Sequence, residues 1–313
     1  MKPQFDAGRG LVLWNYTPVA HNTLHAVRDG WGPVLRQCRG IIFDRRGKLV
    51  ALPFPKFFNL GEHPETQLLP NEPFDATEKH DGHLGIAFRH AHCDWVTTRG
   101  SFHHRTGAIA TRMWREHLRD FRWARQLLEQ MTLLFEVIHP ETRVLRNYGS
   151  RKALVLTGAY DTVSLHDFDH EDLATLGRQL GIPVAQRWPG DLSELVSHAR
   201  DRGVRNREGW VVRFRGGLRM KVKYETYIGR MVEEKLSRTY LLRRLAAGNA
   251  ERMLDTLPEE IYARGTSMLA ELRAAAELPE SNRREYLLTL QGDAATSAYK
   301  AAVDAYLKTL RAS

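Results

Sequence analysis

Cysteine is scarce in this sequence: its 313 residues include two, Cys38 and Cys93. Two cysteines cannot build the disulfide framework that stabilises many small secreted domains, so the sequence predicts a protein of the reducing cytoplasm. Long apolar stretches are also missing, because no run reaches the length that spans a membrane. The N-terminal segment lacks the apolar core of a signal peptide, so no secretory leader is expected.

No internal repeat or low-complexity segment interrupts the chain. With 42% hydrophobic and 27% charged residues, its composition is that of a globular protein. Positive charge is in excess, with a formal net charge of +9 at pH 7. Such a balance favours a polyanionic partner such as nucleic acid. A basic surface without such a partner is the alternative that charge alone leaves open.

The first part of the chain has strand patterns and the last part has helical ones. Short apolar runs between turn residues predict strands at 39–44, 49–52, 84–88, 95–98, 133–138, 153–161, 208–214 and 218–224. Apolar residues at helical spacing predict helices at about 104–130, 171–181 and 191–202. From about residue 225 the pattern is helical, with an apolar stripe formed by Tyr299, Val303, Tyr306, Leu307 and Leu310. We therefore expect two domains, at 1–235 and 236–313.

The segment around Lys79 predicts a lysine at the end of a strand. A polar stretch precedes it, a turn is expected at Asp81-Gly82, and an apolar returning strand follows. A lysine held there can point into a site, and an uncharged lysine amine is a possible covalent nucleophile. Taken alone, this tetrapeptide is a weak signal, because such tetrapeptides are common and an ordinary turn with a solvated lysine accounts for it better.

Polar residues recur at the edges of the predicted strands along the whole first domain. In chain order these residues are Arg39, Lys56, Lys79, Asp81, Glu136, Glu208, Lys221 and Lys223. Cations can hold the oxyanions of an ATP phosphate chain, and hard carboxylates can position Mg²⁺ or its waters. Lys221 and Lys223 share one face of their strand because side chains alternate with period two.

These residues lie in segments that resemble the motifs of the covalent nucleotidyltransferases, the superfamily of ATP-dependent ligases and mRNA capping enzymes. In motif order the matching segments are Lys79-x-Asp81-Gly82, Phe135-Glu136, Ala153 to Asp161, Glu208-Gly209 and Lys221-x-Lys223. Order and approximate spacing both agree with the superfamily.

The chain is most similar to the phage T4 RNA ligase 1 family within that superfamily. The segments that narrow the resemblance are Cys38 to Phe43, Phe54 to Asn59 and Arg99-Gly100-Ser101, and the likeness covers about residues 35–225. It implies an α+β fold, in which an antiparallel-sheet, ATP-grasp-like nucleotidyltransferase domain is followed by an all-α C-terminal domain.

Two positions depart from the family pattern, since His80 and His83 stand where the family often has other residues. Neither is a required chemical position, so the departures bear on nucleotide or metal detail. The helical tail argues against DNA ligases and capping enzymes, which usually carry an OB-fold after the last motif, because an OB-fold needs strands.

The family's reaction has three steps. Lys79 would attack the α-phosphate of ATP and form lysyl-AMP, the AMP would pass to an RNA 5′-phosphate, and a 3′-hydroxyl would then displace it. A free lysine amine is mostly protonated near neutral pH, and the attack needs it neutral. Neighbouring cations (Lys221, Lys223 and Arg39) and a bound metal would favour the neutral form.

The resemblance also implies roles for the other motif residues. Lys223 would contact the α-phosphate, Lys221 would hold the phosphates, and Arg39 and Lys56 would grip the β- and γ-phosphates. The set expected to bind the nucleotide is Arg39, Lys56, Phe58, Gly82, Glu136, Val211, Lys221 and Lys223. The residues expected in the chemistry itself are Lys79, Asp81, Lys221 and Lys223.

Aromatic and acidic residues complete the expected site. A ring of Phe57 or Phe58, with Trp210 or Val211 opposite, would sandwich the adenine. Glu136 would bind the ribose hydroxyls or a metal-bound water. The expected ligands of Mg²⁺ or Mn²⁺ are Asp81, Glu136 and Glu208. For each acid the alternative is a satisfied buried carboxylate with a structural partner.

Several alternatives remain open at this point. The chain could be another nucleotidyltransferase, such as a DNA ligase or a GTP-using capping enzyme, or a basic RNA-binding module with a dead site. The tail could select the RNA substrate, for instance tRNA, or dock a partner, or only pack. We expect a monomer with no membrane contact. Zinc is not expected, because no second cysteine pair accompanies His90, His92, Cys93, His103 and His104.

Overall fold

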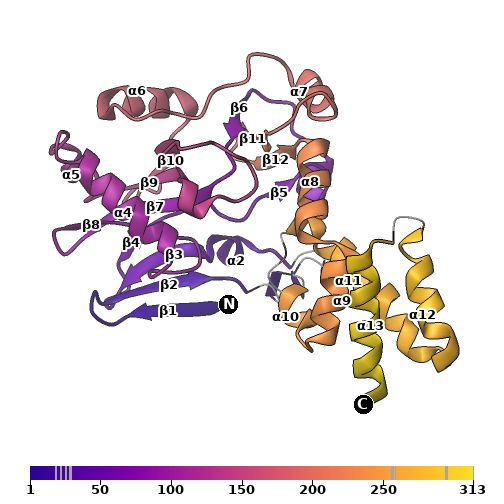
Figure 1. Cartoon of the computed structure of the whole chain (residues 1–313). Coiled ribbons are helices and arrows are strands. Elements are labelled where there is room, and N and C mark those ends of the chain that lie inside the picture. Colours follow the sequence, from indigo (N-terminus) through magenta and orange to yellow (C-terminus); the bar gives the residue numbers. More distant parts are fainter. Residues whose placement is uncertain are drawn as a thin grey trace. The chain divides into compact units, whose positions relative to one another are not determined.

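The computed structural model of the chain describes residues 1–17, 20–21, 23–24, 27, 30–254, 257, 259–292 and 295–312. The chain divides into two compact units, Met1–Tyr224 and Glu225–Ser313 (Figure 1). This division lies one helix before the boundary expected at residue 235. All described strands belong to the first unit, and the described elements of the second are helices.

The strands of the first unit form three sheets of four strands. The first sheet contains, in spatial order, β1 (Lys2–Asp6), β2 (Leu11–Asn15), β3 (Arg39–Asp44) and β4 (Leu49–Ala51). The second contains β10 (Ala153–Asp161), β9 (Met131–Ile138), β7 (His83–His90) and β8 (Cys93–Thr98). The third contains β5 (Phe58–Asn59), β12 (Arg219–Lys223), β11 (Gly209–Phe214) and β6 (Phe74–Lys79). Every pairing is antiparallel except β5 with β12, so the α+β fold is confirmed.

Helices and a second layer of strands cover the two faces of the second sheet. The helical segments of this unit are α2 (Pro33–Gln37), α3 (Pro64–Gln67), α4 (Arg105–His117), α5 (Ala124–Leu127), η1 (Pro140–Thr142), α6 (His170–Leu180) and α7 (Leu192–Ala199). Helices α4 and α6 pack on one face, around Trp114, Phe135 and Leu176. The other face packs on the first sheet, around Leu13, Ile42 and Leu134. Period-two alternation therefore puts Glu136 on the face of β9 that points away from α4.

One helix is shorter than its apolar pattern predicted. The expected helix at 104–130 is wrong, because α4 ends at His117 and α5 is a separate short helix. The chain turns after Leu118, which is fully buried, and the Phe121 ring then stacks on the His117 ring with 4.6 Å between centroids. Apolar side chains in this turn fill the same core that a continuous helix would have covered. The apolar spacing therefore continues beyond His117 although the helix ends there.

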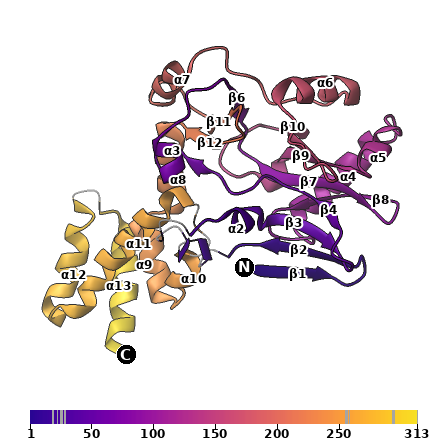
Figure 2. The same ribbon diagram turned by 180° about the vertical axis from the view of Figure 1, so that it is seen from behind.

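The described elements of the second unit are helices (Figure 2), and apolar side chains such as Leu241, Leu272 and Leu287 are buried among them. Its helical segments are α8 (Glu225–Lys235), α9 (Arg238–Ala246), α10 (Ala250–Leu254), α11 (Glu259–Arg273), η2 (Ala274–Glu277), α12 (Glu280–Thr289) and α13 (Ser297–Ala312). Tyr299, Val303 and Tyr306 of the predicted stripe are buried, and Tyr299 Oη donates to the carbonyl of Leu287 at 2.5 Å. No helix in the described part of the chain is both long and apolar enough to cross a membrane.

Candidate active site

Lys79 lies where the chain crosses from one sheet to another. It is the last residue of β6, which pairs with β11 in the third sheet, whereas β7 begins at His83 in the second sheet. The expected turn at Asp81-Gly82 is present, but its two flanking strands do not pair with each other, so the expected returning strand belongs to a different sheet. In the third sheet Gly209 is opposite Lys79 on one side and opposite Lys223 on the other. Three neighbouring strands thus bring two motif lysines to one end of this sheet.

One carboxylate bridges these two lysines. Glu208 Oε2 is 3.0 Å from Lys79 Nζ, and Glu208 Oε1 is 3.0 Å from Lys223 Nζ. Glu208 and Lys223 are buried, while the side chain of Lys79 keeps 22% of its surface exposed. Lys79 is therefore the member of this trio that a ligand can reach from solvent. Its amine must leave the ion pair with Glu208 before its lone pair can attack an electrophile.

Glu136 approaches the turn after Lys79 from the second sheet. Its Oε1 accepts a hydrogen bond from the backbone amide of Gly82 at 2.9 Å. Burial raises the pKa of Glu136 to about 7; Lys79 opposes this rise and the negative charge of Glu208 adds to it. A side chain at position 82 would be excluded, because a Cβ there would lie 2.5 Å from the carbonyl oxygen of Val137. Gly82 thus permits the close approach of the turn to β9.

Asp81 has a structural task that differs from the expected one. It is buried, and its Oδ2 accepts the backbone amides of Leu145, at 2.9 Å, and Arg146. Its own amide donates to Tyr148 Oη at 2.9 Å. These contacts fasten the segment 145–148 to the turn after Lys79. Both main-chain donors reach the same oxygen, Oδ2. The expectation that Asp81 binds a metal or takes part in the chemistry stays a prediction.

The cations expected to bind phosphates differ in where they lie and in how exposed they are. The guanidinium carbon of Arg39 lies 5.7 Å from the centre of the Phe57 ring, and Lys221 Nζ lies 5.9 Å from it. The fold therefore brings the start of β3 and the middle of β12 together around Phe57. Lys56 is only 2% exposed, with Nζ 4.9 Å from the Phe58 ring. In this conformation other side chains cover Lys56, so a phosphate chain that arrives from solvent cannot reach its amine.

Two rings expected to sandwich an adenine belong to the core instead. Phe58 is fully buried and stacks on His63 with 4.1 Å between ring centroids, so it offers no face to a base. Trp210 is buried and donates from Nε1 to Tyr224 Oη at 3.0 Å. Val211 is half-buried and lies between Thr77 and Lys221 in the sheet register, so its place as an adenine contact stays a prediction.

The carboxylates fit a cation that arrives with a nucleotide. The described residues contain no group of three or more His, Cys, Asp or Glu side chains that could hold a metal by themselves, including at the histidines near Cys93. Mg²⁺ is often held by one or two carboxylates together with substrate phosphates and water. Glu136 and Glu208 lie close enough together for the negative charge of Glu208 to raise the pKa of Glu136. These two carboxylates match that donor set.

The sequence interpretation missed the segment that buttresses the turn. Arg146 Nη1 donates to Glu78 Oε1 at 3.0 Å, and its guanidinium lies over the Tyr148 ring at 4.4 Å. His80, between Lys79 and Asp81, is buried as well. The available signal was the density of arginines between β9 and β10, but their spacing matches no regular element.

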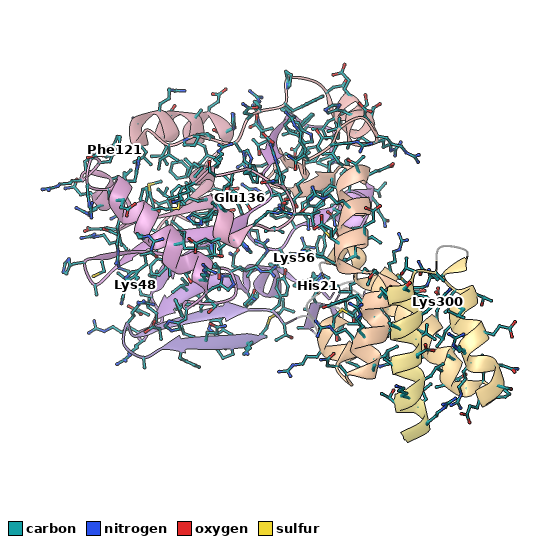
Figure 3. All side chains as sticks on the ribbon, in the orientation of Figure 1. His21, Lys48, Lys56, Phe121, Glu136 and Lys300 are labelled. Carbon is teal, nitrogen blue, oxygen red and sulfur yellow. The ribbon has the colours of Figure 1, made fainter. Side chains whose placement is uncertain are left out.

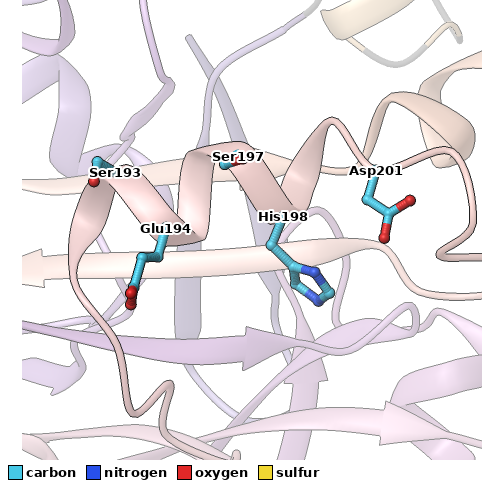
Figure 4. Close-up of a pocket in the computed structure, with 5 residues that line it drawn as sticks. All are labelled: Ser193, Glu194, Ser197, His198 and Asp201. Atoms are coloured by element: carbon cyan, nitrogen blue, oxygen red, sulfur yellow. The ribbon is translucent and has the colours of Figure 1, made fainter.

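An open depression on α7 is a separate feature of this unit. It has a volume of about 580 Å³ and is lined by Ser193, Glu194, Ser197, His198 and Asp201 (Figure 4). Its lining includes two acids and neither lysine nor arginine, so it does not suit a phosphate chain. The residues around Lys79, with Glu136 among the strands of the same unit (Figure 3), remain the candidate site.

Known proteins that are similar to this chain include RNA ligases. A putative RNA ligase of Thermovibrio ammonificans is 31% identical over 191 residues, which are 58% of this chain and 48% of that protein. The chain thus spans about half the length of this curated relative. Two solved structures of an archaeal ATP-dependent RNA ligase match with TM-scores of 0.51 and 0.52, at 15% and 14% identity, over 86% of either chain, which shows a shared fold. The family model of the T4 RNA ligase 1 type, described as RNA ligase, matches residues 37–228. Since that match covers more than half of the sequence, the chain belongs to this RNA ligase family.

Proposed function

We propose that this protein is an ATP-dependent RNA ligase that joins 5′-phosphate and 3′-hydroxyl RNA ends through lysyl-AMP and RNA-adenylate intermediates. The observation that carries the proposal is the placement of Lys79, partly exposed at the end of β6 and bridged through Glu208 to Lys223. Family membership and the fold shared with the archaeal ligase support it.

In the first step the Nζ of Lys79 forms a bond to the α-phosphorus of ATP, and the bond from that phosphorus to pyrophosphate breaks. The ammonium group releases one proton to solvent water, and the amine leaves Glu208 as it engages the phosphate. Lys221 and Lys223, two residues apart on one face of β12, are suited to hold the α-phosphate oxygens. Arg39, which meets Lys221 around Phe57, is suited to the outer phosphates.

A divalent cation, Mg²⁺ or Mn²⁺, would be held by Glu136 and Glu208 together with the nucleotide's own oxygens. When bound it neutralises charge on the phosphates. The second and third steps transfer AMP to the RNA 5′-phosphate and then release it as the 3′-hydroxyl attacks. A role in RNA repair, a cytoplasmic location and a monomeric state belong to the same proposal, and two free cysteines, Cys38 and Cys93, are compatible with that location.

The helical unit is proposed to contribute to the choice of RNA ends, tRNA included. Deleting residues 225–313 should leave label transfer from ATP to Lys79 in place while changing the preference among RNA ends. A soluble truncated protein with unchanged preference would refute this role. Circular dichroism of the truncated protein provides the control for its fold.

A label-transfer experiment tests the reaction. The protein is mixed with Mg²⁺ and ATP labelled at the α-phosphate, denatured, and examined for label that stays on the chain. We expect label on the wild type, none on Lys79→Ala, and no competition by GTP. Labelling by GTP would indicate a capping-type enzyme. A folded wild type that takes up no label with any of several metals would favour an RNA-binding module with a dead site.

A further inference from the structure

Two loops of the first unit concentrate positive charge. The loop between η1 and β10 carries Arg143, Arg146, Arg151 and Lys152, and the loop between α7 and β11 carries Arg200, Arg202, Arg205 and Arg207. We name residues 143–152 and 200–207 together the basic rim. Asp201 is the one acid within them, and its Oδ1 accepts the backbone amide of Gly203 at 2.8 Å. Its charge therefore serves the turn of its own loop.

The cations of the basic rim are accessible. Seven of the eight are exposed, the exception being Arg146, which pairs with Glu78. Within the described parts of the chain, no carboxylate forms an ion pair with any of these seven. Exposed cations at this density repel one another, and the negative charge of a polyanion relieves that repulsion. Counterions condensed on the polyanion are released at the same time, which favours binding further.

The two loops are joined to each other and to the nucleophile. The backbone amide of Asn147 donates to Asn206 Oδ1, and Asn206 Nδ2 donates to the backbone carbonyl of Asn147, both at 3.4 Å. Asp81 ties the first loop to the turn after Lys79 through the amides of Leu145 and Arg146. The second loop ends at Arg207, directly before Glu208, which is ion-paired with Lys79.

The positive charge of the rim also reaches the turn electrostatically. Burial lowers the pKa of His80, the neighbour of Lys79, and Glu78 opposes this effect. The charges of Arg146 and Arg151 then lower it further. The first loop thus lies close enough to act on a residue adjacent to the nucleophile.

We propose that the basic rim binds the phosphate backbone of the RNA strand whose 5′-phosphate receives AMP from Lys79. This inference rests on the proposed ligase function and deepens it. Seven exposed cations on two joined loops exceed what one ATP needs, and the proposed function already assigns Arg39, Lys221 and Lys223 to its phosphates. A chain of successive phosphates matches such an extended set, because backbone contacts position a nucleic acid without reading its sequence.

The arginines of α4 and α5 are the competing basic surface, and the structure favours them less. Arg105 is ion-paired with Glu141, and Arg125 Nε is 3.0 Å from Asp94 Oδ2. Helix α4 also packs on the face of the second sheet from which Glu136 points away. Arg119 and Arg122, exposed and far in sequence from the motif residues, therefore make a charge-matched control.

The test compares two full-length double variants, Arg202→Ala/Arg205→Ala in the rim and Arg119→Ala/Arg122→Ala as the control. Each protein is assayed for label transfer from ATP to Lys79, for affinity to a 5′-phosphorylated single-stranded RNA at several salt concentrations, and for transfer of AMP to that RNA. We expect all to label equally. We expect the rim variant to bind RNA about tenfold more weakly, with the salt slope reduced by about 0.7 for each phosphate that the variant no longer neutralises.

The outcomes separate the rim from the reaction. A rim variant that labels normally and binds RNA like the wild type overturns the proposal and leaves the ligase function standing. An equal loss in the control overturns it too, since net charge alone would then explain binding. Recovery of affinity by Arg202→Lys/Arg205→Lys supports it. Absence of label on the wild type would refute the ligase function, whereas the RNA-affinity measurement would still test the rim.

Discussion

The two units of the chain differ sharply in how they use charge. Residues 1–224 contain 33 Lys or Arg and 24 Asp or Glu, while residues 225–313 contain 13 of each. The whole net charge of +9 therefore belongs to the first unit. In the second unit exposed cations find acids nearby, as in Arg230 with Glu234 and Arg284 with Asp304. Attraction of a polyanion is thus a property of the first unit, and any selection of RNA by the helices must use shape or specific contacts.

The largest effect is expected where charge is buried in the first unit. Glu208→Gln removes the anion that holds Lys79 and Lys223 at 3.0 Å each, leaving two cations without their shared partner. We expect label transfer to Lys79 to fall about a hundredfold, as misplacement of reacting groups can cause. The matched control is Glu129→Gln, an exposed glutamate of the same unit, with wild-type labelling. Normal labelling by Glu208→Gln would show that the bridge is dispensable.

A second substitution tests whether the turn needs its anchor. Asp81→Ala leaves the amides of Leu145 and Arg146 without their acceptor, which should cost about 2 kcal/mol of unfolding free energy. Because the same interaction holds the first loop of the basic rim, transfer of AMP to RNA should decline more than labelling of Lys79. Denaturant melts and the two assays measure this. A stable variant in which both activities remain normal would contradict the anchoring role.

The pH dependence of stability tests the buried carboxyl group of Glu136. The pKa of Glu136 is raised to about 7 from 4.5, so the folded protein holds a proton that the unfolded chain releases between these values. The contribution of the protonated Glu136 carboxyl to the free energy of unfolding is complete below the unfolded pKa. It is lost as the pH rises through about 7. Glu136→Gln imitates the protonated form, and Gln can still accept the Gly82 amide.

In buffer containing a metal chelator, Glu136→Gln should therefore be more stable than the wild type at pH 8 by about 1–3 kcal/mol. The two proteins should have the same stability near pH 4. Thermal melts across this range are the measurement. A difference in stability between the two proteins that is the same at every pH would mean that burial does not raise the pKa of Glu136.

The smallest effect is expected in the helical unit. Arg284 and Asp304 are 3.0 Å apart, but about half of each side chain is exposed. Surface pairs of this kind contribute about 0.5 kcal/mol or less, so Arg284→Ala should shift the melting temperature very little. RNA affinity and its salt dependence should also stay unchanged. A loss as large as that of the rim variant would break the contrast between the two units.

Local patterns located most strands and the alternation along them, but not their partners. Lys221 and Lys223 share a face of β12 as predicted, since that follows from period two alone. The sequence around Lys79 showed a turn, yet it could not show that β6 and β7 pair in different sheets, because pairing depends on distant segments. The helical tail was recognisable from its stripe, and three stripe residues are buried.

The roles of single residues were harder to predict than the elements that carry them. A carboxylate next to a nucleophile has the same sequence signature whether it binds a metal or main-chain amides, and Asp81 does the latter. Phe58 looked like a stacking platform because it neighbours a lysine, but burial depends on the packing of His63 around it. The basic rim was missed because its halves are far apart in sequence and are joined through contacts such as those of Asn147 with Asn206.

The crossing between sheets at Lys79 has a mechanical consequence. Lys79 ends one sheet and Glu136 stands on another, yet the hydrogen bond from Gly82 to Glu136 joins them through three residues of main chain. This short connection therefore limits how far Lys79 and Glu136 can separate, in addition to the packing of the two sheets.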